Sequence, residues 1–174
     1  MAEAKIIERI SIGSMPHPRL GPIWLALSPR GLVGLHMKSS EESVRRTYRA
    51  FDADLDPVQA SPILEQLAAY FEGKSRRFDV PIDWSVLSPF QQEVLQLVFA
   101  IPFGHTRTYV DIATQLGKPG AARAVGRANA TNPMPIIIPC HRVLGADGTL
   151  HGYGGPGGVE TKAWLLRHEG SWLL

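Results

Sequence analysis

Apolar and polar positions divide the chain into two parts with different periodicities. In the first part, two short apolar runs, residues 23–27 and 32–35, flank a Pro-Arg-Gly turn, a pattern typical of a β-hairpin. Ser40 opens a charged stretch that predicts a helix to about Phe51. Apolar residues at helical spacing predict a second helix over residues 61–71. Residues 1–84 are therefore expected to form a small α/β domain with a short sheet.

The second part has the longer spacing of helices. Ser88 with Gln91, and Thr108 with Asp111, form capping-box patterns that mark helix starts. A glycine-containing turn separates the helix after Thr108 from a short helix over residues 121–129. Two short helices joined in this way predict a helix-turn-helix.

Length and composition agree with two small globular domains. The chain has 174 residues, of which 44% are hydrophobic and 20% are charged. The two patterns together predict an α+β fold, with an N-terminal domain over residues 1–84 and a mainly helical C-terminal domain over residues 85–174. Charges among residues 1–8 do not fit a signal peptide, and no apolar run is long enough for a membrane span. We therefore expect a cytoplasmic protein with no membrane partner.

Positive charge gathers in one stretch of the second domain. The formal net charge of the whole chain is only +2, but residues 105–142 hold five lysines and arginines against a single aspartate. Such a stretch suits a surface that faces a polyanion, and it also suits a solvated helix face. Charge alone leaves both interpretations open.

The helix over residues 121–129 has few side chains that could read DNA bases. Helices that read the major groove offer several polar groups to base edges, whereas this one is mostly Ala, Gly and Val around Arg123 and Arg127. Small residues let a helix approach a narrow minor groove without reading sequence. The alternative is a helix that packs its Ala and Gly face against a neighbour.

The chain holds one cysteine, Cys140, and His141 and Arg142 follow it directly. A lone cysteine is often a buried residue selected for packing. Cationic and imidazole neighbours, however, lower the pKa of a thiol and make it a nucleophile. One cysteine can form neither an intrachain disulfide nor a multi-cysteine zinc site, which favours a reducing compartment. The Ile- and Pro-rich run over residues 134–139 predicts an extended segment that leads to Cys140, and adjacent side chains on such a segment point to opposite sides.

Six motifs in order resemble the O6-alkylguanine-DNA alkyltransferase family over residues 85–170. They are Thr-Tyr at 108–109, Ala-Arg-Ala-Val-Gly at 122–126, Asn-Pro at 132–133, Ile-Pro-Cys-His-Arg-Val at 138–143, Tyr-Gly-Gly at 153–155 and Trp-Leu-Leu-Arg-His-Glu-Gly at 164–170. Pro-Cys-His-Arg combined with Arg-Ala-Val-Gly is highly specific. The N-terminal half is compatible with the family's variable α+β domain without identifying it.

The resemblance implies DNA repair in which Cys140 takes the alkyl group of O6-alkylguanine, or of O4-alkylthymine, and is not regenerated. His141 would deprotonate the thiol through a water, with Glu169 orienting the imidazole. Asn132 would brace the turn, and Tyr109 would hydrogen-bond or protonate the leaving guanine.

The resemblance also implies how the damaged DNA is held. Arg123 would fill the gap left by the flipped nucleotide, because the alkyl carbon cannot be reached inside the base stack. The other DNA-contacting residues would be Thr108, Ala122, Ala124, Gly126 and Arg127. The substrate pocket would comprise Pro135, Arg142, Val143, Tyr153, Gly154, Gly155 and Lys162. The protein would act on double-stranded DNA as a monomer, with no cofactor and no metal.

Two features depart from the family pattern. The chain lacks the N-terminal cysteines of relatives that bind zinc. The extension at residues 156–158 leaves the accepted alkyl size open, although Pro135 stands where relatives that accept bulky groups have a proline. Three other interpretations compete. A non-reactive damage binder would lack Cys140, a cysteine hydrolase would need an oxyanion hole and water access, and a transcription factor would need more base-reading side chains.

Overall fold

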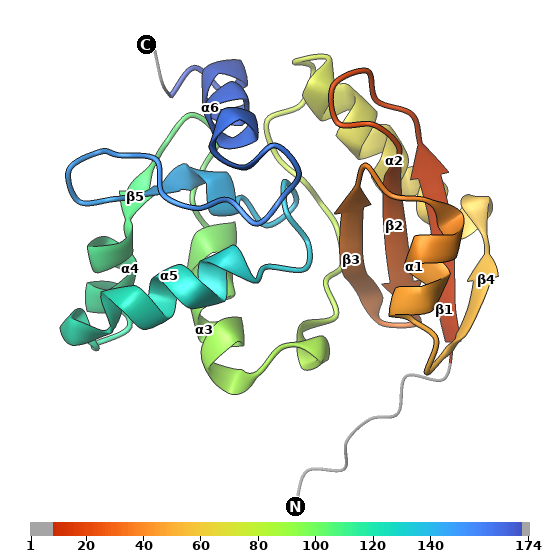
Figure 1. Cartoon of the computed structure of the whole chain (residues 1–174), viewed down its shortest axis with the longest axis horizontal. Coiled ribbons are helices and arrows are strands. Elements are labelled where there is room, and N and C mark those ends of the chain that lie inside the picture. The colour runs from red at the N-terminus through yellow and green to blue at the C-terminus, as the bar shows by residue number, and fades with distance from the viewer. Residues whose placement is uncertain (1–8, 172–174) are drawn as a thin grey trace, which may run out of the picture. The chain divides into compact units, whose positions relative to one another are not determined.

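The chain divides into two compact units (Figure 1), and the division along the sequence lies between Val86 and Leu87. The structure is a computed structural model that describes residues 9–171. Residues 1–8, whose charges argue against a signal peptide, lie outside the described residues. The division comes just after the boundary expected at residue 84.

The first unit is built on a four-stranded sheet with the order β3-β2-β1-β4. β2 (Ile23–Ser28) pairs antiparallel with both β1 (Arg9–Met15) and β3 (Gly31–Met37), so the predicted hairpin is confirmed as β2 and β3. β4 (Asp52–Leu55) pairs parallel with β1 at the edge of the sheet. The hydrophobic pattern does not predict β4, because its sequence Asp-Ala-Asp-Leu is polar and mostly exposed.

Two helices accompany this sheet. α1 (Glu41–Thr47) is capped by Ser40 as expected, but it ends earlier than its charged sequence suggests. α2 (Pro57–Phe71) begins before the predicted start at residue 61, because Asp56 caps its N-terminus and a proline fits the first helical turn. One buried cluster of the unit consists of Ile10, Ile12, Ala26, Val33 and Val44.

The second unit is mainly helical, and the expected α+β fold class is confirmed. Its helices are α3 (Pro89–Phe99), α4 (Tyr109–Gln115), α5 (Ala122–Ala130) and α6 (Gly158–His168). The one-turn η2 (Pro119–Ala121) joins α4 to α5. β5 (Arg107–Thr108) pairs parallel with β6 (Val143–Leu144), which places the start of α4 beside the chain that follows Cys140. Within residues 9–171, no helix is long and apolar enough to cross a membrane.

Side-chain caps set where these helices begin. Thr108 Oγ1 accepts from Asp111 N, and Asp111 Oδ2 accepts from Thr108 N, which confirms the predicted capping box. Ser88 Oγ accepts from Gln91 N at the start of α3. The Gln91 side chain reaches the end of α5, where its Nε2 donates to Thr131 O at 3.1 Å. α3 therefore anchors the helix that precedes the cysteine.

The segment that carries the cysteine is not the extended run that the sequence predicts. The residues of η3 (Cys140–Arg142) form a turn of 3-10 helix, with Arg142 N donating to Pro139 O at 2.9 Å. Just before it, Ile136 has a left-handed φ of 73°. Successive side chains of a 3-10 helix lie about 120° apart, so Cys140 and His141 do not point to opposite sides. That part of the expectation is wrong.

Candidate functional site

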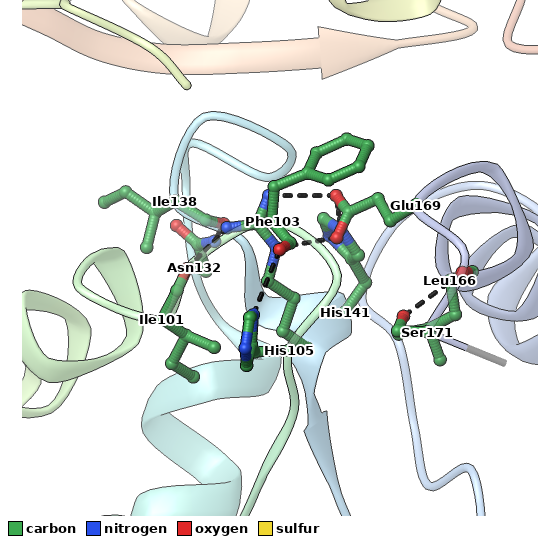
Figure 2. A network of polar contacts seen from close by, with 10 residues as sticks. Ile101, Phe103, His105, Asn132, Ile138, His141, Leu166, Glu169 and Ser171 are labelled. Carbon is green, nitrogen blue, oxygen red and sulfur yellow. Dashed lines mark hydrogen bonds and ion pairs between the residues drawn. The ribbon is translucent and has the colours of Figure 1, made fainter. Parts of the chain in front are cut away.

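Cys140 lies at the start of η3 with 4% of its surface exposed. Asn132 braces the preceding loop. Its Nδ2 donates to Ile138 O at 2.9 Å (Figure 2), and its Oδ1 accepts from Met134 N at 2.9 Å. One amide thus holds the loop that leads to Cys140.

His141 is completely buried and is held by Glu169 at the end of α6. His141 Nε2 and Glu169 Oε1 are 2.7 Å apart (Figure 2). Arg142 donates to both oxygens of the same carboxylate, from Nε at 2.8 Å and from a terminal nitrogen at 2.9 Å. A carboxylate bound by a guanidinium in this way is ionised and can only accept. His141 Nε2 therefore carries a hydrogen, and Nδ1 keeps a free lone pair.

Arg142 does not take the place in the substrate pocket that the sequence suggests. Its guanidinium binds Glu169, and it also donates to Ile101 O at 2.5 Å. Buried cations need such partners, so the side chain turns toward the carboxylate. Arg142 is a support for Glu169 in this structure.

Burial and hydrogen bonding determine the charges of these groups. Burial by itself would raise the pKa of Glu169, but hydrogen bonds from His141 and Arg142 outweigh it and hold that pKa far below its usual range. Burial lowers the pKa of His141, against the opposing effect of the hydrogen bond that His141 donates to Glu169. A neutral imidazole and an anionic carboxylate result. This pair can accept a proton at His141 Nδ1 and stabilise the cation that forms.

Burial also raises the pKa of the Cys140 thiol. The hydrogen bond from Asn132 and the charge of Lys162 lower it, but burial is the larger influence. The thiol is therefore protonated at rest and needs a base before it can act as a nucleophile. His141 is the neighbouring base.

Lys162 is a buried lysine of α6 that joins three segments. Its Nζ donates to Val143 O at 2.7 Å, to His151 O at 3.0 Å and to the Tyr109 hydroxyl at 3.5 Å. Burial lowers the pKa of Lys162 to about 8, while the charge of Cys140 raises it. Burial raises the pKa of Tyr109, which is the first residue of α4. A hydroxyl beside an ammonium group is thus held close to the thiol.

A glycine-rich segment packs against the end of α5. A Cβ at Gly154 would lie 2.2 Å from Ala130 O, so this approach requires glycine. Burial, and then the charge of Cys140, raise the pKa of the neighbouring Tyr153 well above its ordinary value. Tyr153 is therefore a neutral, buried wall beside the thiol.

Two other residues predicted to line the pocket make contacts with the backbone of the same unit, and so does the extension at residues 156–158. Pro135 is buried and forms an isolated bridge with Ile138. Gly155 O accepts from Gly158 N at the start of α6. In the extension, Pro156 O accepts from Thr161 Oγ1 at 2.7 Å. These contacts hold Pro135 within the loop before Cys140 and tie the end of the glycine-rich segment to the start of α6.

A cavity of about 590 Å³ opens between helices α4 and α5 and the loop over residues 145–152. Tyr109 lines it and connects it to the buried site through its hydroxyl. Three of the predicted DNA-contacting residues also line it, namely Ala122, Arg123 and Gly126. Its predominantly small and apolar walls suit a flat base.

The two arginines of α5 are both exposed but line different hollows. Arg123 lines the 590 Å³ cavity, whereas Arg127 lines a groove of about 260 Å³ together with Ala124. Thr108 is occupied as the cap of α4. The predicted DNA-contacting residues therefore lie on neighbouring faces of one helix pair.

Asn129 belongs to the site although no motif indicates it. It is 2% exposed, and its Nδ2 donates to Cys140 O at 3.1 Å. The sequence does carry one signal, because Asn129 follows Val125 by four residues and so lies on the apolar face of α5. A polar side chain on a buried face needs a hydrogen-bond partner or has a functional role.

Three buried side-chain atoms have no hydrogen-bond partner among the described residues. They are Asn129 Oδ1, His141 Nδ1 and the Tyr153 hydroxyl. All three residues adjoin Cys140, by a hydrogen bond, by sequence or by charge. Buried polar groups are nearly always paired, so their concentration around one thiol indicates a site prepared for a reactant. Within residues 9–171, no three His, Cys, Asp or Glu side chains are grouped to hold a metal ion.

Both units match protein-family models. Residues 15–84 match the 6-O-methylguanine DNA methyltransferase, ribonuclease-like domain, and residues 89–171 match the 6-O-methylguanine DNA methyltransferase, DNA binding domain.

Curated relatives and solved structures agree with these matches. A methylated-DNA–protein-cysteine methyltransferase of Mycobacterium bovis is 45% identical over 152 residues, covering 87% of this chain and 88% of the relative. A protein of the same name from Salmonella typhimurium is 53% identical over 110 residues, covering 63% of each. The crystal structure of Mycobacterium tuberculosis OGT in complex with DNA aligns with a TM-score of 0.76 and 42% identity, covering 92% of this chain and 93% of that one.

Proposed function

The chain belongs to the 6-O-methylguanine DNA methyltransferase family, and from that premise we propose that it repairs DNA by moving the alkyl group of O6-alkylguanine onto Cys140. The relatives are named for transfer to a protein cysteine, and this chain has only one. The observation that carries the proposal is the unpaired Nδ1 of a buried His141, which is held by Glu169 and adjoins that cysteine.

The reaction begins with the proton of the thiol. His141 Nδ1 takes it through a bridging water, and the Glu169 carboxylate stabilises the imidazolium that forms. Burial of Cys140 disfavours the thiolate until this transfer occurs. Formation of the nucleophile therefore depends on His141 as the base.

The alkyl transfer is an in-line displacement at carbon. The thiolate sulfur attacks the alkyl carbon, the S–C bond forms as the C–O6 bond breaks, and the electron pair of the broken bond stays on guanine. The Tyr109 hydroxyl gives its proton to a ring nitrogen of the departing base, which leaves as neutral guanine. Lys162 Nζ, 3.5 Å from that hydroxyl, stabilises the remaining phenolate.

DNA can use this site only if the damaged nucleotide leaves the duplex, because the thiol is buried. Arg123 is exposed beside the cavity and fills the gap in the base stack while the lesion is held. Ala122 and Gly126 lie in the same wall and let α5 approach the minor groove closely. Sequence-independent contacts of this kind suit a repair protein.

The reaction stops at the alkylated cysteine. An S-alkyl cysteine is a stable thioether, so Cys140 is used once and each protein molecule repairs one lesion. A single copy of the chain holds every residue of the proposed site, and a monomer is sufficient. We place the reaction in the cytoplasm, where bacteria such as the relatives keep their DNA, and cell fractionation tests this.

A substitution of the acceptor tests the proposal. Wild-type protein is mixed with duplex DNA containing one O6-methylguanine, and restoration of guanine is followed by cleavage with a methylation-sensitive restriction enzyme. Wild type is expected to restore the site, and Cys140→Ala is expected to restore none of it while still binding the DNA. Repair by the alanine variant would contradict the proposal.

A further inference from the structure

Asn129 occupies a place between the cysteine and the tyrosine of the proposed reaction. Its Nδ2 donates to Cys140 O at 3.1 Å, and this bond is buried. Because a carbonyl oxygen can only accept, the bond also fixes which end of the amide faces the cysteine. The Asn129 side chain therefore has one orientation.

The geometry of α5 brings the same side chain to Tyr109. Gly126 and Asn129 are three residues apart and share a face of the helix. A Cβ on Gly126 would lie 3.8 Å from two ring carbons of Tyr109, so the tyrosine ring lies over that face. Burial raises the pKa of Tyr109 and the Asn129 side chain lowers it, which agrees with the two groups lying on the same face of the helix.

The other end of the Asn129 amide is its acceptor oxygen. Its Oδ1 is buried and has no partner among the described residues. A side chain that only filled space on this apolar face of α5 would be more stable as a hydrocarbon, because an unpaired buried acceptor is costly. The amide donates to the backbone of the acceptor cysteine, lies on the helix face that Tyr109 covers and leaves its own acceptor unpaired, which favours a role in the reaction.

We propose that Asn129 is a positioning residue for alkyl transfer. It holds the hydroxyl of Tyr109 at a fixed position relative to the sulfur of Cys140, so that the leaving guanine is protonated as the S–C bond forms. This role rests on the proposed function. Asn129 stabilises the phenolate left on Tyr109 by donating a hydrogen bond to its oxygen. It does not touch the thiol proton, which belongs to His141.

Two alkyl donors separate this role from a general structural one. Transfer from O6-methylguanine needs a proton on the departing base, whereas iodoacetamide alkylates the same sulfur with iodide as a leaving group that needs none. For Asn129→Leu, the single-turnover rate at saturating DNA is expected to fall by about tenfold or more, because a positioned general acid contributes at least that much. Its rate with iodoacetamide is expected to stay within about twofold of wild type, since neither acid nor DNA is involved. Equal losses with both donors, or no loss with DNA, would overturn the proposal.

A second variant and a double substitution distinguish loss of this role from misfolding. Asn129→Ser keeps one donor in a smaller side chain and is expected to retain more of the DNA rate than Asn129→Leu. In a Tyr109→Phe background, Asn129→Leu is expected to cause no additional loss, because both changes remove one function. Additive losses, or equal rates for the serine and leucine variants, count against the proposal. If wild type itself places no methyl group on Cys140, the proposed function fails; if wild type reacts and the variants do not differ from it, only the role of Asn129 fails.

Discussion

Glu169 accepts hydrogen bonds from both His141 and Arg142, and at the residue scale these contacts decide the charges around the thiol. The carboxylate stays anionic despite burial, which keeps His141 Nε2 protonated and Nδ1 free. No hydrophobic pattern could reveal this arrangement, because the contacts join residues far apart in sequence. The motif containing Cys140 indicates the chemistry, but only the fold shows that Arg142 supports Glu169 rather than the pocket.

The same charges predict how stability depends on pH. In the folded state the pKa of His141 is lowered from its ordinary 6.5, so the unfolded chain binds this proton first. The stabilisation is complete above pH 6.5 and is lost as the pH falls below it. The pKa of Glu169 is lowered from 4.5, so a further loss begins as the pH falls below that value.

Urea unfolding at a series of pH values measures this effect. The difference in unfolding free energy between wild type and His141→Gln is expected to shrink between pH 7 and pH 5, because glutamine does not titrate. A difference that stays constant, or that grows toward acid, would show that His141 is not buried as a neutral base.

At the scale of elements, α5 connects the DNA surface to the acceptor site. The sequence shows its small residues and Arg123, and the helix forms within one residue of its predicted start. The sequence does not predict the role of its buried face, because Asn129 joins the site through a hydrogen bond to the backbone of Cys140. The sequence also does not predict the turn at Cys140–Arg142. A run of Ile and Pro residues favours an extended chain, and the left-handed backbone of Ile136 interrupts that chain.

The two exposed arginines of α5 give this element a matched test. Arg123→Ala is expected to slow repair of duplex DNA by about 10- to 100-fold even at saturating DNA, because extruding a base costs a few kcal/mol. Its reaction with free O6-methylguanine base is expected to change little. Arg127→Ala serves as the control, since it lines the other groove and is expected to weaken DNA binding without slowing the saturated reaction. Equal losses of Arg123→Ala on DNA and on free base would argue against a role in flipping.

At the scale of the whole molecule, every residue of the proposed site belongs to the second unit, after residue 87. The fold class and the hairpin of the first unit follow from periodicity and turn residues. The polar edge strand β4 and the true start of α2 do not, because they depend on pairing with β1 and on the cap by Asp56. The first unit carries no residue of the proposed chemistry, which is consistent with a scaffold.

The proposed function requires that one alkyl group moves irreversibly to one cysteine. Intact-mass and peptide-mapping spectrometry of the protein after incubation with excess duplex DNA bearing O6-methylguanine tests it most directly. We expect a single methyl group per protein molecule, located on Cys140, with one lesion removed for each protein consumed. Removal of several lesions per protein, or lesion loss with Cys140 unmodified, would contradict it.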